Sequence, residues 1–268
     1  MNTITIGCDP EVFVKQGGLF KSAFALIKGD KKNPSPVPKG AVQVDGMALE
    51  FNIDPADNAD DFCINIQTVF DTLRGMVPEY EIAITPVAHF DEAYFRSQPE
   101  AALELGCDPD FSGWTREANA KPSTDKPMRT ASGHVHVGWD NGLEGQGHFE
   151  MCCDLAKQMD FYLGLPSLTY DTNTERRELY GDAGCFRPKP YGFEYRTLSN
   201  CWLQNDHLIK WVFRATRAAW DAWLAGNRPY ETMDVRHIIK NSDVAEAIRI
   251  CTELGIEMPY QVEMQKAA

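Results

Sequence analysis

The sequence predicts an α+β fold in which helices cover one face of an antiparallel sheet. Strand-like and helix-like segments follow one another without the regular alternation that a parallel sheet requires. Several strand-like segments place polar residues two apart, and this spacing puts both side chains on one face of a strand. We therefore expect one face of the sheet to pack on helices and the other to carry polar groups. No linker-like stretch divides the 268 residues, so one domain over residues 1–268 is expected.

Alternating or β-branched runs mark the expected strands. Pro10 interrupts the first run, as is typical of an edge strand or a bulge. The dipeptide Asp45-Gly46 favours a tight turn, so the segments on either side of it are expected to pair as a hairpin. Residues 28–40 are polar and rich in proline, which indicates a loop. The strands are expected at residues 4–14, 41–44, 47–53, 81–85, 132–139 and 193–198.

Helices are expected where apolar residues recur at helical spacing. Asn58 is a suitable N-cap for the first helix, which continues to Leu73. The other helices are expected at residues 146–164, 204–225 and roughly 242–254. Residues 97–130 and 167–192 show no regular pattern, and long irregular segments in a compact domain are usually functional or mobile.

Composition argues against several classes of protein. The chain has 26 basic and 39 acidic residues, a net charge of −13, which disfavours a nucleic-acid partner and docking on an anionic membrane. No apolar run is long enough to predict a membrane span, and the N-terminus lacks a signal-peptide pattern. The eight cysteines show no C-x-x-C spacing, so reduced thiols in the cytoplasm are expected instead of a zinc site.

Two early strands carry acidic pairs. Asp9 and Glu11 are expected on one face of the first strand, and Glu50 and Asn52 on one face of a later one, with Asp45 just ahead of it. Carboxylates about 4 Å apart repel by roughly 4 kcal/mol at an intermediate dielectric, and a divalent cation reverses that repulsion. Metal binding is therefore one interpretation of these pairs, and a solvated edge strand is the other.

A later strand carries two histidines. His134 and His136 share one face of a strand that is otherwise rich in valine. Two imidazoles in such a place need partners, and neutral imidazole is the commonest ligand of transition metals. We expect at least one of the two histidines to belong to a site, although a lone histidine is more often structural.

Residues 187–196 are the densest polar segment of the chain. Glu194 and Arg196 are expected on one strand face, and Arg187 and Lys189 on the loop before it. The planar fork of arginine matches phosphate oxygens, and lysine supplies a point charge. A carboxylate beside these cations predicts a site for phosphate and metal, the alternative being an internal network of salt bridges.

Common nucleotide-binding and hydrolase motifs do not occur in the sequence. It contains no P-loop, no G-x-G-x-x-G between a strand and a helix, no G-x-S-x-G elbow and no H-E-x-x-H. An ATP-using enzyme with this sequence would therefore not be a P-loop enzyme.

The ordered set of polar motifs resembles that of the phage-encoded carboxylate–amine ligases (amidoligases) of the glutamine synthetase and glutamate–cysteine ligase-like superfamily. The matching stretches are GCDPEVF, VDG followed by EFN, GHVHVG and RPKPYGFEYR, spread over residues 7–200. The resemblance implies an antiparallel sheet that forms a funnel, with helices packed on its outer face. ATP would enter the funnel from one end and the other substrates from the opposite end.

The resemblance also implies roles for individual residues. The implied metal ligands are Asp9, Glu11, Glu50, Glu194 and one of His134 and His136, with His134 preferred. Asp45 or Asn52 is a further candidate. Arg196 would hold the transferring phosphate, while Arg187 and Lys189 would neutralise phosphate charge. The sequence departs from its relatives in having aspartate, not glutamate, as the first acid of the first strand.

The implied reaction depends on ATP and has two steps. A substrate carboxylate attacks the γ-phosphate to give an acyl phosphate and ADP, and an amine then displaces phosphate to form an amide. Mg²⁺, or Mn²⁺ in view of the histidine, and arginine would stabilise charge on the phosphoryl oxygens. The expected partners are small-molecule or peptide carboxylates and amines. The irregular segments 97–130 and 167–186 would bind them, the second through Arg176, Arg177 and Tyr180.

Other functions fit parts of the pattern. A metal-dependent hydrolase without ATP has less use for three cations beside its metal ions. A guanidino-type phosphotransferase would share the superfamily fold but would form no amide. A catalytically inactive binding protein would be expected to lack the ligand carboxylates, which are present. The sequence does not indicate which acid and amine react or the oligomeric state, and a phage origin would place the protein in the host cytoplasm.

Overall fold

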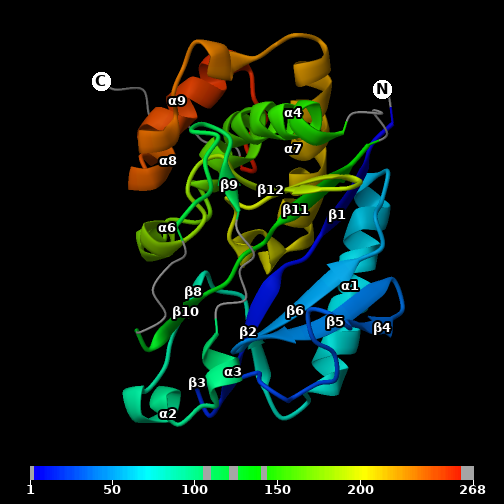
Figure 1. Cartoon of the computed structure of the whole chain (residues 1–268), viewed down its shortest axis with the longest axis vertical. Helices are drawn as coiled ribbons and strands as arrows, with labels where there is room; N and C mark the ends of the chain where they lie inside the picture. The colour runs from blue at the N-terminus through cyan, green and yellow to red at the C-terminus, as the bar shows by residue number, and fades with distance from the viewer. Residues whose placement is uncertain (1–2, 105–109, 121–125, 140–143, 261–268) are drawn as a thin grey trace.

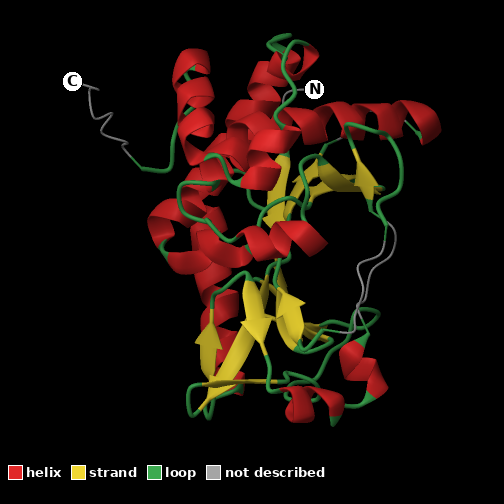
Figure 2. Cartoon of the chain, turned by 90° about the vertical axis from the view of Figure 1, so that its left-hand side faces the viewer, coloured by secondary structure: helices red, strands yellow, loops and turns green. Residues whose placement is uncertain are grey.

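The computed structural model describes residues 3–104, 110–120, 126–139 and 144–260. In these ranges a layer of helices lies beside antiparallel sheets (Figures 1 and 2). The predicted α+β class is therefore confirmed. The described strands form three sheets, where the sequence had predicted one.

The first sheet has five strands, all paired antiparallel. In spatial order they are β1 (Thr5–Cys8), β11 (Val135–Gly138), β13 (Gly192–Tyr195), β12 (Cys185–Lys189) and β9 (Phe111–Ser112). The second sheet contains β3 (Leu19–Lys21), β2 (Glu11–Gln16), β6 (Ala48–Ile53), β5 (Gly40–Asp45), β4 (Ser35–Val37) and, on β2, β7 (Glu81–Ala83). A third sheet pairs β8 (Val87–His89) with β10 (Met128–Thr130).

The chain passes from the first sheet to the second at Asp9 and Pro10. β1 ends at Cys8 and β2 begins at Glu11. Proline has no N–H to donate to a ladder, so Pro10 ends the first strand, and its carbonyl accepts from the N–H of Phe51 at 3.2 Å. The interruption at Pro10 was predicted. The prediction that Asp9 and Glu11 share a face of one strand is wrong, because the crossing sends them toward different sheets.

The longer helices form where apolar spacing predicted them. The helices are α1 (Ala59–Met76), α2 (Glu92–Arg96), α3 (Glu100–Leu103), α4 (Gly145–Met159), α5 (Leu165–Ser167), α6 (Thr174–Leu179), α7 (Asp206–Leu224), α8 (Arg236–Asn241) and α9 (Val244–Leu254). A π-helical turn, Asp160–Gly164, continues α4, and single 3-10 turns lie at Asn200–Gln204 and Pro229–Glu231. Asn58 caps α1 as predicted, its side chain accepting from the N–H of Asp61 at 2.9 Å.

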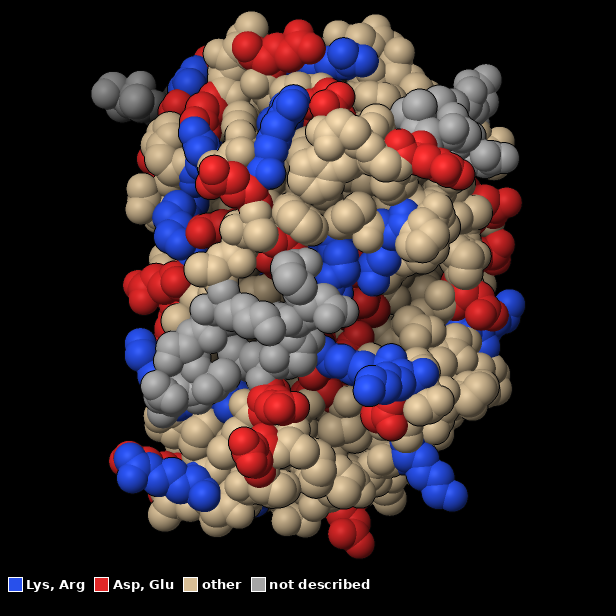
Figure 3. All heavy atoms as spheres, viewed as in Figure 1, with Lys and Arg blue, Asp and Glu red and all other residues tan. Residues whose placement is uncertain are grey.

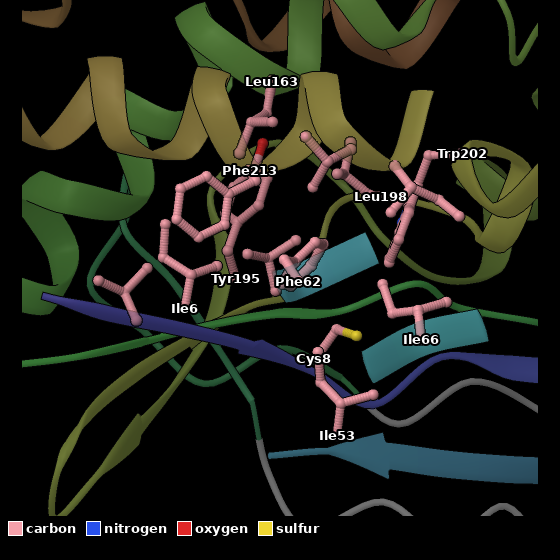
Figure 4. Close-up of a cluster of buried hydrophobic side chains, with 14 of the residues drawn as sticks. Ile6, Cys8, Ile53, Phe62, Ile66, Leu163, Tyr195, Leu198, Trp202 and Phe213 are labelled. Carbon is pink, nitrogen blue, oxygen red and sulfur yellow. The ribbon is translucent and has the colours of Figure 1, made fainter. Parts of the chain in front are cut away.

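The helical layer covers one face of the strands. α1 packs on β5 and β6, α4 packs on β12 and β13, and α7 packs on both of these helices. Buried apolar side chains from sheets and helices form one large cluster. Figure 4 shows Ile6, Cys8 and Tyr195 of this cluster between the strands and the helices. Strand neighbours of these residues point to the opposite face, where the predicted site residues lie.

Part of the segment predicted to be irregular at 167–192 is regular. It contains α6 and β12, so Arg187 and Lys189 lie on a strand and not on the predicted loop. Pro188 is compatible with this strand because β9 pairs only with Cys185 and Phe186 among the described residues, which leaves the proline at an edge.

Two other segments predicted as loops also hold short elements. Residues 28–40 include β4, and residues 97–130 include α3, β9 and β10. Residues 105–109 and 121–125 of the second segment, with Lys121, lie outside the described residues.

The described cysteines are all buried free thiols. Cys8, although next to Asp9, packs in the apolar cluster, as expected of a small core residue. Within the described ranges, no helix is both long enough and apolar enough to cross a membrane.

Candidate active site

Asp9, His134 and Glu194 converge where the chain crosses between the sheets. His134 directly precedes β11, and its Nδ1 atom lies 3.2 Å from Oδ1 of Asp9 and 3.2 Å from Oε1 of Glu194. One possible ligand atom from each of the three residues lies within 4.8 Å of the others. The Glu194 side chain is fully buried. This donor set of two carboxylates and one imidazole suits a divalent cation.

Glu11, Asp45 and Glu50 form a second group of the same kind. Glu11 opens β2 and is paired with Glu50 of β6, while Asp45 is the last residue of β5. Their ligand atoms also lie within 4.8 Å of one another. Of the two further candidates, Asp45 therefore joins a carboxylate group. Asn52 belongs to neither group but lines an adjoining cavity.

The first group has the protonation states that a metal site needs. Burial alone would raise the pKa of Asp9, but the adjacent His136 and His134 hold that pKa well below its ordinary value. Burial, helped by the charge of Arg196, lowers the pKa of His134 well below its ordinary value. An ionised carboxylate therefore faces a neutral imidazole, and these are the forms that bind metal ions.

The second group is an accumulation of like charge. Burial, and then the charge of Asp45, raises the pKa of Glu11 to about 7. Burial, and then the charges of Asp9, Asp45 and Glu11, raises the pKa of Glu50 well above its ordinary value. Oxygen ligands grouped in this way suit Mg²⁺, which would convert their repulsion into attraction.

Three cations surround the buried carboxylate of Glu194. Its Oε2 atom lies 2.8 Å from Nζ of Lys189 and 3.6 Å from Nη1 of Arg187, and its Oε1 atom accepts from Arg196. Arg187 is the cross-strand partner of Glu194 in the ladder between β12 and β13. Guanidinium and ammonium groups gathered in this way suit the phosphate oxygens of a nucleotide.

Arg196 is held by residues from three separate segments. Its Nε atom donates to Oδ2 of Asp110 at 3.3 Å, and its terminal nitrogens contact Glu194 and the hydroxyl of Tyr180. The sequence had not indicated Asp110, because it lies in the irregular segment and matches no motif. The sequence had predicted Tyr180 as a substrate ligand. In the structure its hydroxyl contacts the guanidinium group of Arg196 and helps to orient that group.

Two cavities meet at the two groups of ligands. The smaller has a volume of about 90 Å³, and its lining includes Glu11, Asp45, His134, Tyr180 and Arg196. The larger has a volume of about 600 Å³, and its lining includes Gly7, Asn52, His136, Lys189 and Tyr191. A volume of this size is ordinary for a small-molecule site.

Four residues line both cavities: Asp9, Lys31, Glu50 and Arg187. Asp9 and Glu50 supply one carboxylate from each group of ligands. Arg187 comes from β12 of the first sheet, and Lys31 comes from the loop before β4 of the second. Figure 3 shows basic and acidic side chains gathered together in the middle of this face of the molecule. We call the place where these four residues line both cavities the junction. A ligand in one cavity can meet a ligand in the other there, next to both acidic and basic side chains.

His136 lies beside the first group of ligands. Its Nε2 atom is 3.0 Å from Oδ1 of Asp9, and its Nδ1 atom is 2.6 Å from the hydroxyl of Tyr191. The rings of His136 and Tyr191 are stacked, with 18° between their planes. Of the two histidines, His134 thus contacts both carboxylates of the group, whereas His136 contacts Asp9 alone.

The two arginines predicted to bind substrate occupy structural positions. Arg176 is 1% exposed and donates to the carbonyls of Thr197 and Leu198, each at 2.8 Å, which fixes the chain that follows β13. Arg177 is 3% exposed and is paired with Asp171. A substrate carboxylate would have to displace these partners, so the structure favours a role for both arginines in holding the site together.

Lys31 is the other residue of the site that sequence reasoning missed. Its Nζ atom lies 2.8 Å from Oδ2 of Asp45. It belongs to the proline-rich segment that was interpreted only as a loop. No pattern distinguishes it from the neighbouring lysines, and only the folded chain brings it to the junction.

Part of the chain matches a known protein family. Residues 123–221 match the family model described as phage phiEco32-like COOH.NH2 ligase-type 2. The match confirms the resemblance to phage-type carboxylate–amine ligases. It includes His134, Arg187, Lys189, Glu194 and Arg196, whereas the acidic residues of the first 50 positions precede it. No curated protein was found to match the chain.

Proposed function

We propose that the protein is an ATP-dependent carboxylate–amine ligase that forms an amide through an acyl phosphate. The carrying observation is the junction, where two groups of metal-type ligands and three clustered cations stand between two cavities. The proposal includes a glutamine synthetase-like arrangement, in which nucleotide and acceptor approach from opposite sides. The family match over residues 123–221 supports the ligase class.

Two divalent ions, Mg²⁺ or Mn²⁺, would be held by the two groups of ligands. Asp9, His134 and Glu194 would hold one ion, and Glu11, Asp45 and Glu50 the other. Ions bound there would neutralise phosphate charge and polarise the phosphoryl group. The fit of the residues is good, since both sets are rich in oxygen and the buried Nε2 atom of His134 lacks a hydrogen-bond partner among the described residues.

The larger cavity is the better place for the nucleotide. Its volume is about 600 Å³, and Arg187 and Lys189 are among its lining residues at the junction. Tyr191, which is 46% exposed, offers an aromatic face at the same cavity. The smaller cavity would take the reacting end of the acceptor.

The residues of the chain then act on the phosphoryl group as it moves. The acceptor carboxylate forms a bond to the γ-phosphorus while the bond from that phosphorus to the bridging oxygen breaks, and the electron pair leaves with ADP. Arg196, held by Asp110, Glu194 and Tyr180, keeps the phosphoryl oxygens in place. The amine substrate then attacks the acyl carbon and releases phosphate.

The acceptor and the amine are proposed to be small molecules or peptide termini. The net charge of −13 argues against a nucleic acid as the partner. The proposal includes a cytoplasmic location and a single domain.

Calorimetric binding of a non-hydrolysable ATP analogue tests the proposal without knowledge of the substrates. The wild type is expected to bind the analogue with Mg²⁺ and to bind it at least tenfold more weakly in EDTA. Glu194→Gln removes a ligand carboxylate and should lose the metal-dependent part of the affinity. Glu81→Gln, an exposed change on β7, is the matched control and should bind as the wild type does.

The alternative functions give different results. Uptake of Mn²⁺ without any nucleotide binding would refute the ligase and favour a metal-dependent hydrolase. Binding followed by phosphate transfer to a guanidino compound, with no amide product, would favour a phosphotransferase. A screen of acid and amine pairs for ADP release follows if the analogue binds.

A further inference from the structure

Asp160 is a buried carboxylate on the helical side of the first sheet. It opens the π-helical turn that continues α4, and it is fully buried. Its Oδ1 atom accepts from the hydroxyl of Tyr195 at 2.7 Å and from the N–H of Gly184 at 2.9 Å. Its Oδ2 atom accepts from Nε1 of Trp114 at 2.6 Å. Because π-helical turns are rare and frequently lie at functional sites, one that starts at such a carboxylate points to a role for it.

The three donors belong to segments that are far apart in the sequence. Trp114 follows β9, Gly184 directly precedes β12, and Tyr195 is the last residue of β13. The N–H of Gly113 also donates to the carbonyl of Gly184 at 2.9 Å. A Cβ on Gly184 would lie 2.5 Å from Cδ1 of Trp114, so the chain passes very close to this ring. Asp160 therefore joins the three segments at the point where they meet.

The same three segments hold Arg196 on the other side of the sheet. Its backbone N–H donates to the carbonyl of Cys185, the first residue of β12, at 2.8 Å. Its Nε atom donates to Oδ2 of Asp110, which directly precedes β9. Neighbouring side chains of a strand point to opposite faces, so Tyr195 points to the helices while Arg196 lines the smaller cavity. The segments that place the guanidinium group are thus the ones that Asp160 joins.

The loop of residues 110–119 connects the two sides of the sheet. Within it, the backbone N–H of Asn119 donates to the carbonyl of Asp110 at 2.9 Å, and its Nδ2 atom donates to Oδ1 of Asp110 at 3.1 Å. Trp114 lies in the same loop and binds Asp160 on the helical side. Loss of that hydrogen bond would loosen the loop, and Asp110 would then hold Arg196 less firmly.

We propose that Asp160 is a positioning residue that fixes Arg196 for phosphoryl transfer. The inference rests on the proposed ligase function. Asp160 lies on the helical side of the sheet and acts through its three donors. Placement of a charged group matters most when charge moves during the reaction. Displacement of Arg196 would therefore weaken contacts with a phosphoryl group in transfer more than contacts with the bound nucleotide.

The test measures binding of ADP with Mg²⁺, with and without aluminium fluoride, which imitates a phosphoryl group in transfer. Asp160→Asn keeps the size of the side chain, but its amide turns an N–H toward one of the three donors. This variant is expected to bind Mg·ADP within about twofold of the wild type and to lose about tenfold of the tightening that aluminium fluoride produces. Tyr195→Phe deletes a single donor and should lose a smaller part of the tightening.

Two comparisons separate positioning from a general loss of stability. In an Arg196→Lys background, Asp160→Asn should cause little further loss of tightening, because residues that act through one another have non-additive effects. Ile250→Ala leaves a cavity in the apolar cluster between α5 and α9 and should lower stability without changing the tightening. Urea denaturation shows which variants are folded, and Tyr195→Phe serves as the test if Asp160→Asn is not.

Each outcome bears on the inference. If Asp160→Asn and Tyr195→Phe tighten with aluminium fluoride as much as the wild type does, Asp160 only stabilises the fold and the inference fails, although the ligase function stands. An equal loss of tightening in Ile250→Ala, or a full further loss in the Arg196→Lys background, would also refute it. If the wild type binds Mg·ADP but gains nothing from aluminium fluoride, the inference fails alone. If the wild type binds no nucleotide at all, the proposed function fails and the inference fails with it.

Discussion

Replacing Glu50 by glutamine should stabilise the metal-free protein and weaken its response to metal. Glu50 is 9% exposed, is paired with Glu11 across the ladder and belongs to the group whose ligand atoms lie within 4.8 Å of one another. Two ionised carboxylates at that separation repel by about 3 kcal/mol at an effective dielectric constant of 20. Lys31 offsets part of this through Asp45, so Glu50→Gln is expected to raise the free energy of unfolding by about 1–3 kcal/mol at pH 8 in EDTA.

The pH dependence of this gain follows from the pKa shifts. Burial and the neighbouring carboxylates raise the pKa of Glu50 well above its ordinary value and that of Glu11 to about 7. The folded state therefore holds protons that the unfolded chain releases near pH 4, so the stability of the metal-free wild type falls as the pH rises from about 4 through these raised pKa values. Glu50→Gln removes one of the two groups, and its advantage should grow over the same interval.

Urea denaturation at pH 5 and pH 8, in EDTA and in Mg²⁺ or Mn²⁺, measures both effects. Metal should stabilise the wild type by an amount that rises with its concentration, as for any ligand of the folded state. It should stabilise Glu50→Gln less, because only the group of Asp9, His134 and Glu194 keeps all of its ligands. Glu81→Gln is the exposed control and should respond to metal as the wild type does. A variant that is less stable than the wild type in EDTA at pH 8 would show that the carboxylates do not repel one another, and the reasoning would be refuted.

Three further changes test other parts of the structure. Arg176→Met should lower the free energy of unfolding by about 3 kcal/mol or more, because it leaves buried carbonyl acceptors without a donor, and unchanged stability in urea would contradict this structural role. Gly133→Ala, directly before His134, would place a Cβ 2.3 Å from Nε1 of Trp202. The free energy of unfolding is expected to fall by about 1–3 kcal/mol and Mn²⁺ to bind more weakly. Binding of Mn²⁺ equal to that of the wild type would contradict this prediction. Burial raises the pKa of Asp160 to about 7, so ionisation of Asp160 should reduce stability as the pH rises from about 4 to about 7. In a pH series of melting temperatures, Asp160→Asn should flatten the slope over this interval. An unchanged slope would contradict this prediction.

The fold was predictable wherever local signals decide the structure. The cap at Asn58, the turn at Asp45-Gly46 and the break at Pro10 each act within a few residues, and all three were identified. The strand at Arg187 was missed because its proline disfavours a central strand, and only the short length of the pairing with β9 makes an edge position available. That information lies in the tertiary structure and not in the local sequence.

The candidate site was predictable only to the extent that its residues repeat at strand spacing. His134 and His136, or Glu194 and Arg196, are two apart, and such pairs are visible in a sequence. Lys31 and Asp110 stand alone in irregular segments, and both reach the site through contacts with residues distant in the chain. Arg176 shows the reverse problem, since an arginine in a polar loop has the composition of a substrate ligand and yet is buried against backbone carbonyls.

The segment Asp9-Pro10-Glu11 explains why the two groups of ligands lie side by side. Pro10 ends the first sheet, and the next residue opens the second. Asp9 therefore joins His134 and Glu194, whereas Glu11 joins Asp45 and Glu50. Two carboxylates on one strand face would have served a single ion. Because the proline separates them into two sheets, Asp9 and Glu11 belong to two neighbouring groups of ligands, and the short link between the two residues keeps those groups close together. In the proposed reaction, two ions on one polyphosphate would need two groups of ligands at such close range.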